Sequence, residues 1–359
     1  ETHHADSEAS NDLVRLDLTG ASPPVQIASG HDFFAAPRLS PDGTHLAWLT
    51  WDHPDMPWDA TSLWLAPVTP DGELGSATVV AGGKDESILQ PEWSPDGVLH
   101  FVSDRNGWWN LYRPTGKKVE PVYREDAEFA VPHWTFGSRR FAFLDDGRIV
   151  AIPVMPTGER LVVIEHGKAR EVPTPFASYQ STLAVHGTRV FLVASGPDVA
   201  TTVVAIDIDS GKLETLRAPD GPPIDKAYHS IPEHITFDTP DGPAYALFYP
   251  PVNPDYTGPA GEAPPIIVEI HGGPSSSTSA RLDPEGLFWT SRGIGILDVD
   301  HGGSTAAGRD FRRRLDGQWG VVDVRDCALA AAHLAAIGKA DPKKLMIHGG
   351  SAGGFTTLL

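Results

Sequence analysis

The first two-thirds of the chain repeats one pattern of apolar and polar positions. Short runs that alternate apolar with polar residues flank tight turns such as Pro41-Asp42-Gly43 and Pro95-Asp96-Gly97. Alternation with a period of two is typical of a half-buried β-strand. Proline presets φ for a turn and glycine accepts a positive φ, so these tripeptides favour tight turns. The pattern therefore predicts antiparallel strands joined by turns.

These strands fall into repeating units of about 40–55 residues, the size of a four-stranded propeller blade. Each unit is expected to hold a short strand, a glycine-containing turn and a second strand, and the last two units diverge from the others. The units cover residues 37–49, 91–102, 132–143 and 183–193. We interpret residues 1–229 as a β-propeller that lacks one or more N-terminal blades. A β-sandwich with coincidental turns is the alternative.

The pattern changes near residue 230. Residues 231–249 predict two strands, and Ile266–Ile270 and 295–299 are continuous apolar runs typical of buried strands. Residues 322–337 have helical spacing, and another short apolar strand follows at 345–347. Strands that alternate with helices predict a mostly parallel sheet, so a second domain is expected over residues 230–359.

A Gly-x-Ser-x-Gly sequence follows the last predicted strand, with Ser351 at its centre. Flanked by a strand and a helix, this sequence is typical of the nucleophile elbow of an α/β-hydrolase, where small neighbours permit a strained turn. We therefore predict that Ser351 is a nucleophile; a purely structural glycine-rich turn is the alternative. His271-Gly272-Gly273-Pro274, after an earlier strand, predicts a turn whose backbone N–H helps to form an oxyanion hole. The second donor would be the N–H of Ala352.

Four motifs occur together in order, at residues 271–274, 302–311, 317–323 and 349–354. Their sequences are His-Gly-Gly-Pro, Gly-Gly-Ser-Thr…Gly-Arg-Asp-Phe, Gly-x-Trp-Gly-x-x-Asp and Gly-Gly-Ser-Ala-Gly-Gly. The chain thereby resembles the prolyl oligopeptidase family of serine peptidases, closest to its acylaminoacyl-peptidase and dipeptidyl-aminopeptidase-like branch. The resemblance implies a β-propeller joined to an α/β-hydrolase domain, with Ser351 as nucleophile and the N–H groups of Gly273 and Ala352 in the oxyanion hole. His301 departs from the family pattern, where arginine is common, and Ala352 stands where a larger residue is common.

The chain order of this fold places the catalytic acid and histidine after the serine. Only eight residues follow Ser351, and none is Asp or His. We therefore expect residues 230–359 to be the N-terminal half of an α/β-hydrolase domain, truncated after the elbow. The missing C-terminal half would be the main partner, as a second polypeptide, a cleaved piece or an omitted segment.

Composition and charge indicate which partners and which location to expect. A net charge of −19 argues against nucleic acid as a partner, and no apolar run is long enough to predict a membrane span. The single cysteine, Cys327, excludes an internal disulfide framework and fits a reducing compartment, so a cytoplasmic location is expected. No metal and no cofactor is implied, and a homo-oligomer is possible.

The predicted function is a serine peptidase that hydrolyses short peptides or aminoacyl amides through an acyl-enzyme, with the propeller limiting substrate size. An esterase or amide hydrolase of small non-peptide molecules and a non-catalytic propeller scaffold are the alternatives. Glu86 and Glu128 precede equivalent units and are candidates for binding a substrate ammonium; solvated loop acids are the alternative. The tryptophans at 93, 108, 109 and 134 are expected in blade cores, and residues 300–326 are expected to pack beside the active site.

Overall fold

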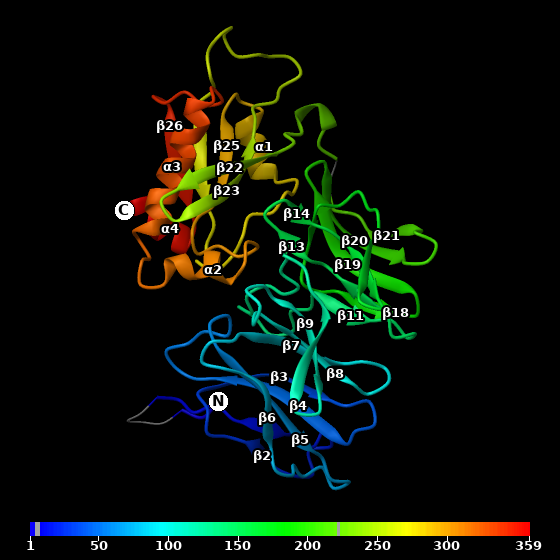
Figure 1. Ribbon diagram of the computed structural model, residues 1–359. Coiled ribbons are helices and arrows are strands. Elements are labelled where there is room, and N and C mark those ends of the chain that lie inside the picture. Colours follow the sequence, from blue (N-terminus) through cyan, green and yellow to red (C-terminus); the bar gives the residue numbers. More distant parts are fainter. Residues whose placement is uncertain (4–7, 221–222) are drawn as a thin grey trace.

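The computed structural model describes residues 1–3, 8–220 and 223–359, and its first part is a series of antiparallel sheets (Figure 1). A two-stranded hairpin comes first, formed by β1 (Leu13–Arg15) and β2 (Val25–Ala28). The first four-stranded sheet has the order β3-β4-β5-β6, so each strand pairs with the next in sequence. Its strands are β3 (Phe33–Leu39), β4 (His45–Trp51), β5 (Thr61–Pro67) and β6 (Thr78–Gly83).

Three further antiparallel sheets follow along the chain, two with four strands and the last with five. The second consists of β7 (Ile88–Trp93), β8 (Leu99–Ser103), β9 (Asn110–Thr115) and β10 (Lys118–Tyr123). The third consists of β11 (Phe141–Phe143), β12 (Ile149–Ala151), β15 (Val162–Glu165) and β16 (Lys168–Glu171), beside a small hairpin of β13 (Val154–Met155) and β14 (Gly158–Glu159). The fourth consists of β17 (Ser178–Tyr179), β18 (Ala184–His186), β19 (Arg189–Gly196), β20 (Val199–Asp207) and β21 (Leu213–Arg217). The predicted antiparallel strands are therefore present.

One predicted strand is absent. The third unit was expected to begin with a strand near residues 132–136, but this segment lies in the loop between β10 and β11. Pro132 has no N–H for a strand ladder, and its carbonyl instead accepts a hydrogen bond from the N–H of Trp134 at 2.9 Å. The prediction for this strand was wrong because the local turn and a distant contact of Trp134 take priority over the alternating pattern.

Residues beyond 230 form a single mixed sheet with the strand order β22-β23-β25-β24-β26. Its strands are β22 (Glu233–Thr239), β23 (Gly242–Tyr249), β24 (Ile266–Ile270), β25 (Gly295–Asp300) and β26 (Leu345–Gly349). β24 runs parallel to both β25 and β26, whereas β23 is antiparallel to β22 and β25. Every strand pair among the described residues lies wholly before or wholly after residue 229.

Helices accompany this sheet, and the one that the apolar spacing at 322–337 predicted is present as α3. They are α1 (Pro284–Thr290), α2 (Arg309–Arg312), α3 (Val322–Ala336) and α4 (Ala352–Leu358), with short 3₁₀ turns η1 (Lys226–Tyr228) and η2 (Arg313–Leu315). The buried core unites side chains of the central strands, such as Val268 and Leu297, with Leu334 of α3. Among the described residues, no helix has the length and apolar character needed to cross a membrane.

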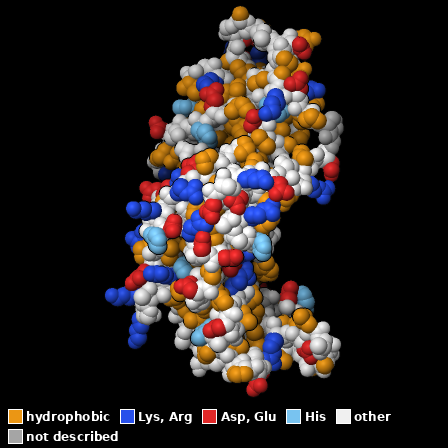
Figure 2. Space-filling view, turned by 90° about the vertical axis from the view of Figure 1, so that its right-hand side faces the viewer, with side chains coloured by type: hydrophobic (Ala, Val, Ile, Leu, Met, Phe, Trp, Pro, Cys, Tyr) orange, Lys and Arg blue, Asp and Glu red, His pale blue; other side chains and the backbone are white. Residues whose placement is uncertain are grey.

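The surface mixes charges of both signs. Figure 2 shows Lys and Arg side chains interspersed with Asp and Glu across the middle of one face. The chain carries a net charge of −19, and on this face its acidic side chains have basic neighbours.

Candidate active site

Ser351 lies between β26 and α4 in an uncommon backbone conformation. Its φ is 54° and its ψ is −120°. For a residue with a side chain this positive φ is strained, and such strain persists only where surrounding structure holds it. The serine is exposed and directly precedes the first residue of α4. This is the strand–turn–helix context that the Gly-x-Ser-x-Gly sequence predicted.

Close packing explains the glycines of that sequence. A Cβ atom added at Gly353 would lie 2.1 Å from the carbonyl oxygen of Ile270, and one at Gly349 would lie 2.5 Å from the carbonyl oxygen of Gly353. Both distances are far shorter than van der Waals contact. α4 therefore packs its backbone directly on the end of β24, and this close approach brings the turn after β24 to Ser351.

The turn at residues 271–274 lies against the elbow. A Cβ atom added at Gly272 would come within 3.3 Å of the Ser351 Cβ atom. Gly273 has a φ of 128°, which favours glycine. Its N–H donates no hydrogen bond to any of the described residues. The N–H of Ala352 is the first of α4 and has no partner one turn earlier in the helix. Two N–H groups that could bind an oxyanion thus lie on the two segments that meet at Ser351.

A buried polar network supports this turn. The Nε2 atom of His271 lies 2.7 Å from the Ser304 hydroxyl and 3.8 Å from a carboxylate oxygen of Asp300. Asp300 also accepts hydrogen bonds from the N–H and hydroxyl of Thr278. Burial raises the pKa of Asp300, while the nearby His271 acts in the opposite direction. The imidazole of His301 stacks on that of His271, with ring centroids 4.9 Å apart.

The histidines near the elbow have other partners. Burial lowers the pKa of His301 to about 4, which favours a neutral ring, and its Nδ1 atom lies 2.9 Å from the Gly302 carbonyl oxygen. His348 lies 2.8 Å from Glu269, and that contact raises the pKa of its imidazole. Among the described residues, no side chain forms a hydrogen bond with the Ser351 hydroxyl. The expected acid–histidine pair is therefore not formed by these residues.

The two candidate ammonium ligands of the first part differ in their surroundings. Glu86 receives hydrogen bonds from Ser103 and from Arg105, whose Nη2 atom is 2.7 Å away. Glu128 is 1% exposed, and one of its carboxylate oxygens accepts the Trp109 N–H at 2.7 Å. Neither carboxylate is free of protein partners, and substrate binding by either stays a prediction.

A cluster that sequence reasoning missed joins the two parts of the molecule. Arg312 of α2 donates to Asp104 at 2.7 Å, although 208 positions separate them in sequence, and both side chains are buried. The Arg312 guanidinium also lies 4.0 Å from the centre of the Trp109 ring and 3.6 Å from Glu128. The Arg309 N–H donates to the Gly107 carbonyl at 2.7 Å. The motif Gly-Arg-Asp-Phe was the only signal that could have drawn attention to this segment.

Trp134 corrects another expectation. Trp109 is fully buried as predicted, but Trp134 is 49% exposed and is not part of a blade core. Its indole N–H donates to the Ser275 carbonyl at 2.9 Å, which connects the first part of the chain to the turn beside Ser351.

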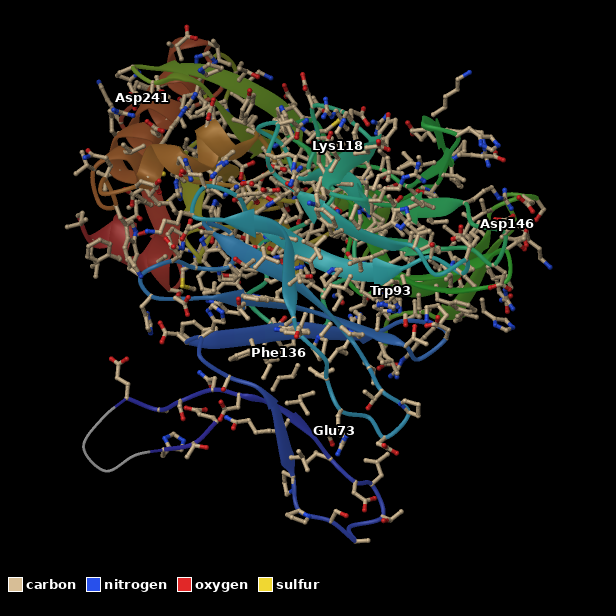
Figure 3. All side chains as sticks on the ribbon, turned by 60° about the horizontal axis from the view of Figure 1, so that its bottom comes forward. Glu73, Trp93, Lys118, Phe136, Asp146 and Asp241 are labelled. Carbon is tan, nitrogen blue, oxygen red and sulfur yellow. The ribbon has the colours of Figure 1, made fainter. Side chains whose placement is uncertain are left out.

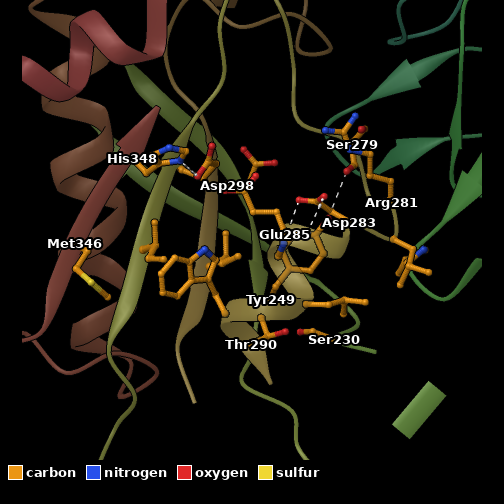
Figure 4. A pocket seen from close by; sticks show the side chains of 18 of the residues that line it. Ser230, Tyr249, Ser279, Arg281, Asp283, Glu285, Thr290, Asp298, Met346 and His348 are labelled. Carbon is orange, nitrogen blue, oxygen red and sulfur yellow. Dashed lines mark hydrogen bonds and ion pairs between the residues drawn. The ribbon is translucent and has the colours of Figure 1, made fainter. Parts of the chain in front are cut away.

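The sheet also lines a pocket away from Ser351, with a volume of about 330 Å³. Figure 4 shows that Met346 and His348 of β26 border it together with Asp298 of β25 and Glu285 of α1. Burial, followed by the charge of Asp300, raises the pKa of Asp298 well above its usual range. Within the described part of the chain β26 pairs only with β24, and its apolar residues Leu345–Ile347 are 41–49% exposed. This edge of the sheet is open.

The strained turn at Ser351, the adjacent glycine turn and the mixed sheet are together typical of α/β-hydrolases. Residues 281–359 match the model of the prolyl oligopeptidase family. An acylamino-acid-releasing enzyme of Arabidopsis thaliana is 37% identical over 97 residues, which cover 27% of this chain and 13% of that enzyme. The match to the prolyl oligopeptidase family thus lies in residues 281–359, and the resemblance indicated by the motifs is confirmed.

Two solved structures extend the similarity over nearly the whole chain. A puromycin-hydrolyzing peptidase of Mycobacterium tuberculosis is 40% identical with a TM-score of 0.93, covering 98% of this chain and 55% of that one. A puromycin hydrolase is 44% identical with a TM-score of 0.91, covering 96% of this chain and 54% of that one. The chain therefore spans about half the length of these solved relatives.

Proposed function

We propose that this chain carries the nucleophile of a serine peptidase that hydrolyses short peptides or aminoacyl amides through an acyl-enzyme. The observation that supports it most is the position of Ser351 on a strained turn, against the glycine turn at 271–274. The hydroxyl of Ser351 would attack the substrate carbonyl, and the N–H groups of Gly273 and Ala352 would bind the oxyanion. One such donor is typically worth about 10²–10³ in rate.

The proposed fold is a β-propeller, without its N-terminal blade or blades, followed by the first half of an α/β-hydrolase domain. We propose that the acid and the histidine of the triad come from the second half of that domain, outside residues 1–359. Two observations support this: none of the described residues bonds to the Ser351 hydroxyl, and β26 leaves an apolar edge open beside a pocket. Further strands and helices would pack on this edge and cover it.

The histidine would take the Ser351 proton as the serine attacks and then donate it to the leaving amine, and water would release the acyl group. The propeller would restrict access to short, unfolded substrates. The names of two solved relatives give puromycin as the compound that they hydrolyse. Puromycin is therefore the first amide to test. Glu86 or Glu128 would bind a substrate ammonium through its carboxylate.

Labelling with a fluorophosphonate tests the nucleophile in the catalytically complete protein. We expect one adduct on wild-type protein, at Ser351, and none on a folded Ser351→Ala variant. A folded wild-type protein that takes no label, or a variant that keeps the label, would contradict the proposal. The first outcome would favour a non-catalytic scaffold.

Turnover separates peptidase from esterase function. We expect aminoacyl anilides and puromycin to be hydrolysed with higher kcat/KM than short-chain esters, and both activities to disappear in Ser351→Ala. Ester turnover without amide turnover would show that the substrate class is wrong although the nucleophile is right.

A further inference from the structure

Trp134 projects from the loop between β10 and β11 toward the turn that follows β24. Its indole Nε1–H donates to the Ser275 carbonyl at 2.9 Å, across 141 positions of sequence. Ser275 is two residues after Gly273, the proposed oxyanion donor, and a Cβ atom added at Gly272 would lie 3.3 Å from the Ser351 Cβ atom. The tryptophan is therefore attached to the glycine turn of the candidate site from the side of the antiparallel sheets.

The ring is held in place although it is half exposed. Trp58, itself 5% exposed, packs against it with ring centroids 4.3 Å apart and planes inclined by 47°. One side of the indole is thus supported by a buried aromatic side chain and its N–H is fixed by a backbone carbonyl. Since 49% of Trp134 stays exposed, a rigid aromatic surface faces open space beside the turn.

Such an arrangement suits recognition of an apolar group. Aromatic side chains provide large contact areas, and stacked ring pairs contribute beyond the area they bury. A ring whose rotamer is already fixed loses little conformational entropy when it binds. Trp58 and the Ser275 carbonyl contact the ring, and about half of Trp134 is left exposed on a residue bonded just past the turn that lies against Ser351.

We propose that Trp134 is a specificity-determining residue that stacks on an aromatic or large apolar side chain of the substrate, while its N–H positions the oxyanion turn. This inference rests on the proposed function of Ser351. It assigns two separable roles to one side chain: the ring selects substrates, and the N–H acts on turnover through the backbone at Ser275.

Two substitutions separate these roles. Trp134→Phe keeps an aromatic ring and removes the N–H, whereas Trp134→Leu removes both. The probes are phenylalanyl and alanyl 4-nitroanilide, used with the catalytically complete protein. We expect Trp134→Leu to reduce the ratio of kcat/KM for the two anilides roughly tenfold, the order of an aromatic contact together with its buried area. Trp134→Phe should lower kcat for both anilides alike and keep their ratio within about threefold.

Phe136→Leu is the matched control. Phe136, labelled in Figure 3, belongs to the same loop and is 81% exposed, but it lines a small cavity with Ala36 and Leu89 of the first two sheets. We expect this variant to keep the wild-type substrate ratio.

The outcomes are distinct. A Trp134→Leu protein that is labelled by fluorophosphonate and shows an unchanged substrate ratio would overturn the inference and leave the proposed function intact. A ratio that falls equally in Trp134→Phe and Trp134→Leu would also overturn it, because the effect would then follow the N–H alone. Wild-type protein without label or turnover would contradict both proposals.

Discussion

Glu128 illustrates how one residue acquires its properties from its surroundings. Burial is the largest influence and raises the pKa of its carboxyl from 4.5 to about 7, while Arg312 acts in the opposite direction. The folded protein therefore holds this proton more tightly than the unfolded chain. The protonated carboxyl stabilises the fold fully below about pH 4.5, and this contribution is lost as the pH rises toward 7.

Replacing Glu128 by glutamine removes this titration. The free energy of unfolding of wild-type protein should fall relative to Glu128→Gln between about pH 5 and pH 8, by up to roughly 3 kcal/mol. Urea denaturation followed across this range measures it. Glu120→Gln, which alters an exposed carboxylate of β10, should leave the pH dependence of wild type unchanged. If the free energy of unfolding changed with pH in the same way for wild type and Glu128→Gln, the expectation would be contradicted.

At the scale of elements, the site depends on how closely α4 approaches β24. The Ser351 conformation is strained, and it is retained because β26, β24 and α4 are packed around it with glycine at the contacts. The sheet and helix therefore supply the free energy that holds the serine in place.

Gly353→Ala should disturb this packing. Its Cβ atom would lie 2.1 Å from the Ile270 carbonyl oxygen, so α4 would have to move away from β24. We expect a loss of about 3 kcal/mol or more in the free energy of unfolding and a loss of fluorophosphonate labelling. Gly350→Ala is the control for stability, since a Cβ atom there would have nothing within 4 Å. Equal midpoints of denaturation for the two variants would contradict this account.

On the scale of the whole molecule, the antiparallel sheets and the mixed sheet are joined through buried charges. Arg312 and Asp104 lie between them with side chains only 4% and 0% exposed. Removing one member of such a pair leaves the other charge buried without compensation, which is strongly destabilising.

Arg312→Leu should therefore lower the free energy of unfolding by about 3–5 kcal/mol and allow the two parts to unfold in separate transitions. Arg313→Leu is a neighbouring control, because Arg313 is 40% exposed and its partner Asp85 is 89% exposed; its effect should be below about 1 kcal/mol. Calorimetry measures the number and the temperatures of the unfolding transitions in the two variants. A single cooperative transition for Arg312→Leu at the wild-type temperature would contradict the role of this pair.

Sequence patterns were most informative where a segment's structure depends on its own residues. The strand Ile266–Ile270 has the predicted bounds, and the helix expected at 322–337 is Val322–Ala336. The strand before Ser351 and the helix after it were also predicted. The strand near residue 132 and the buried position of Trp134 were wrong, because the Ser275 carbonyl, far away in sequence, determines where that ring lies.

By itself, the sequence determined the periodicity of strands and helices, the turns and the Gly-x-Ser-x-Gly motif, since each depends on neighbours a few residues apart. Only the tertiary structure decided that Arg312 meets Asp104, that Trp134 reaches the turn beside Ser351 and that Glu128 is buried. These contacts join residues that are distant in sequence. Their energies depend on burial and on local dielectric, which no local pattern of residues encodes.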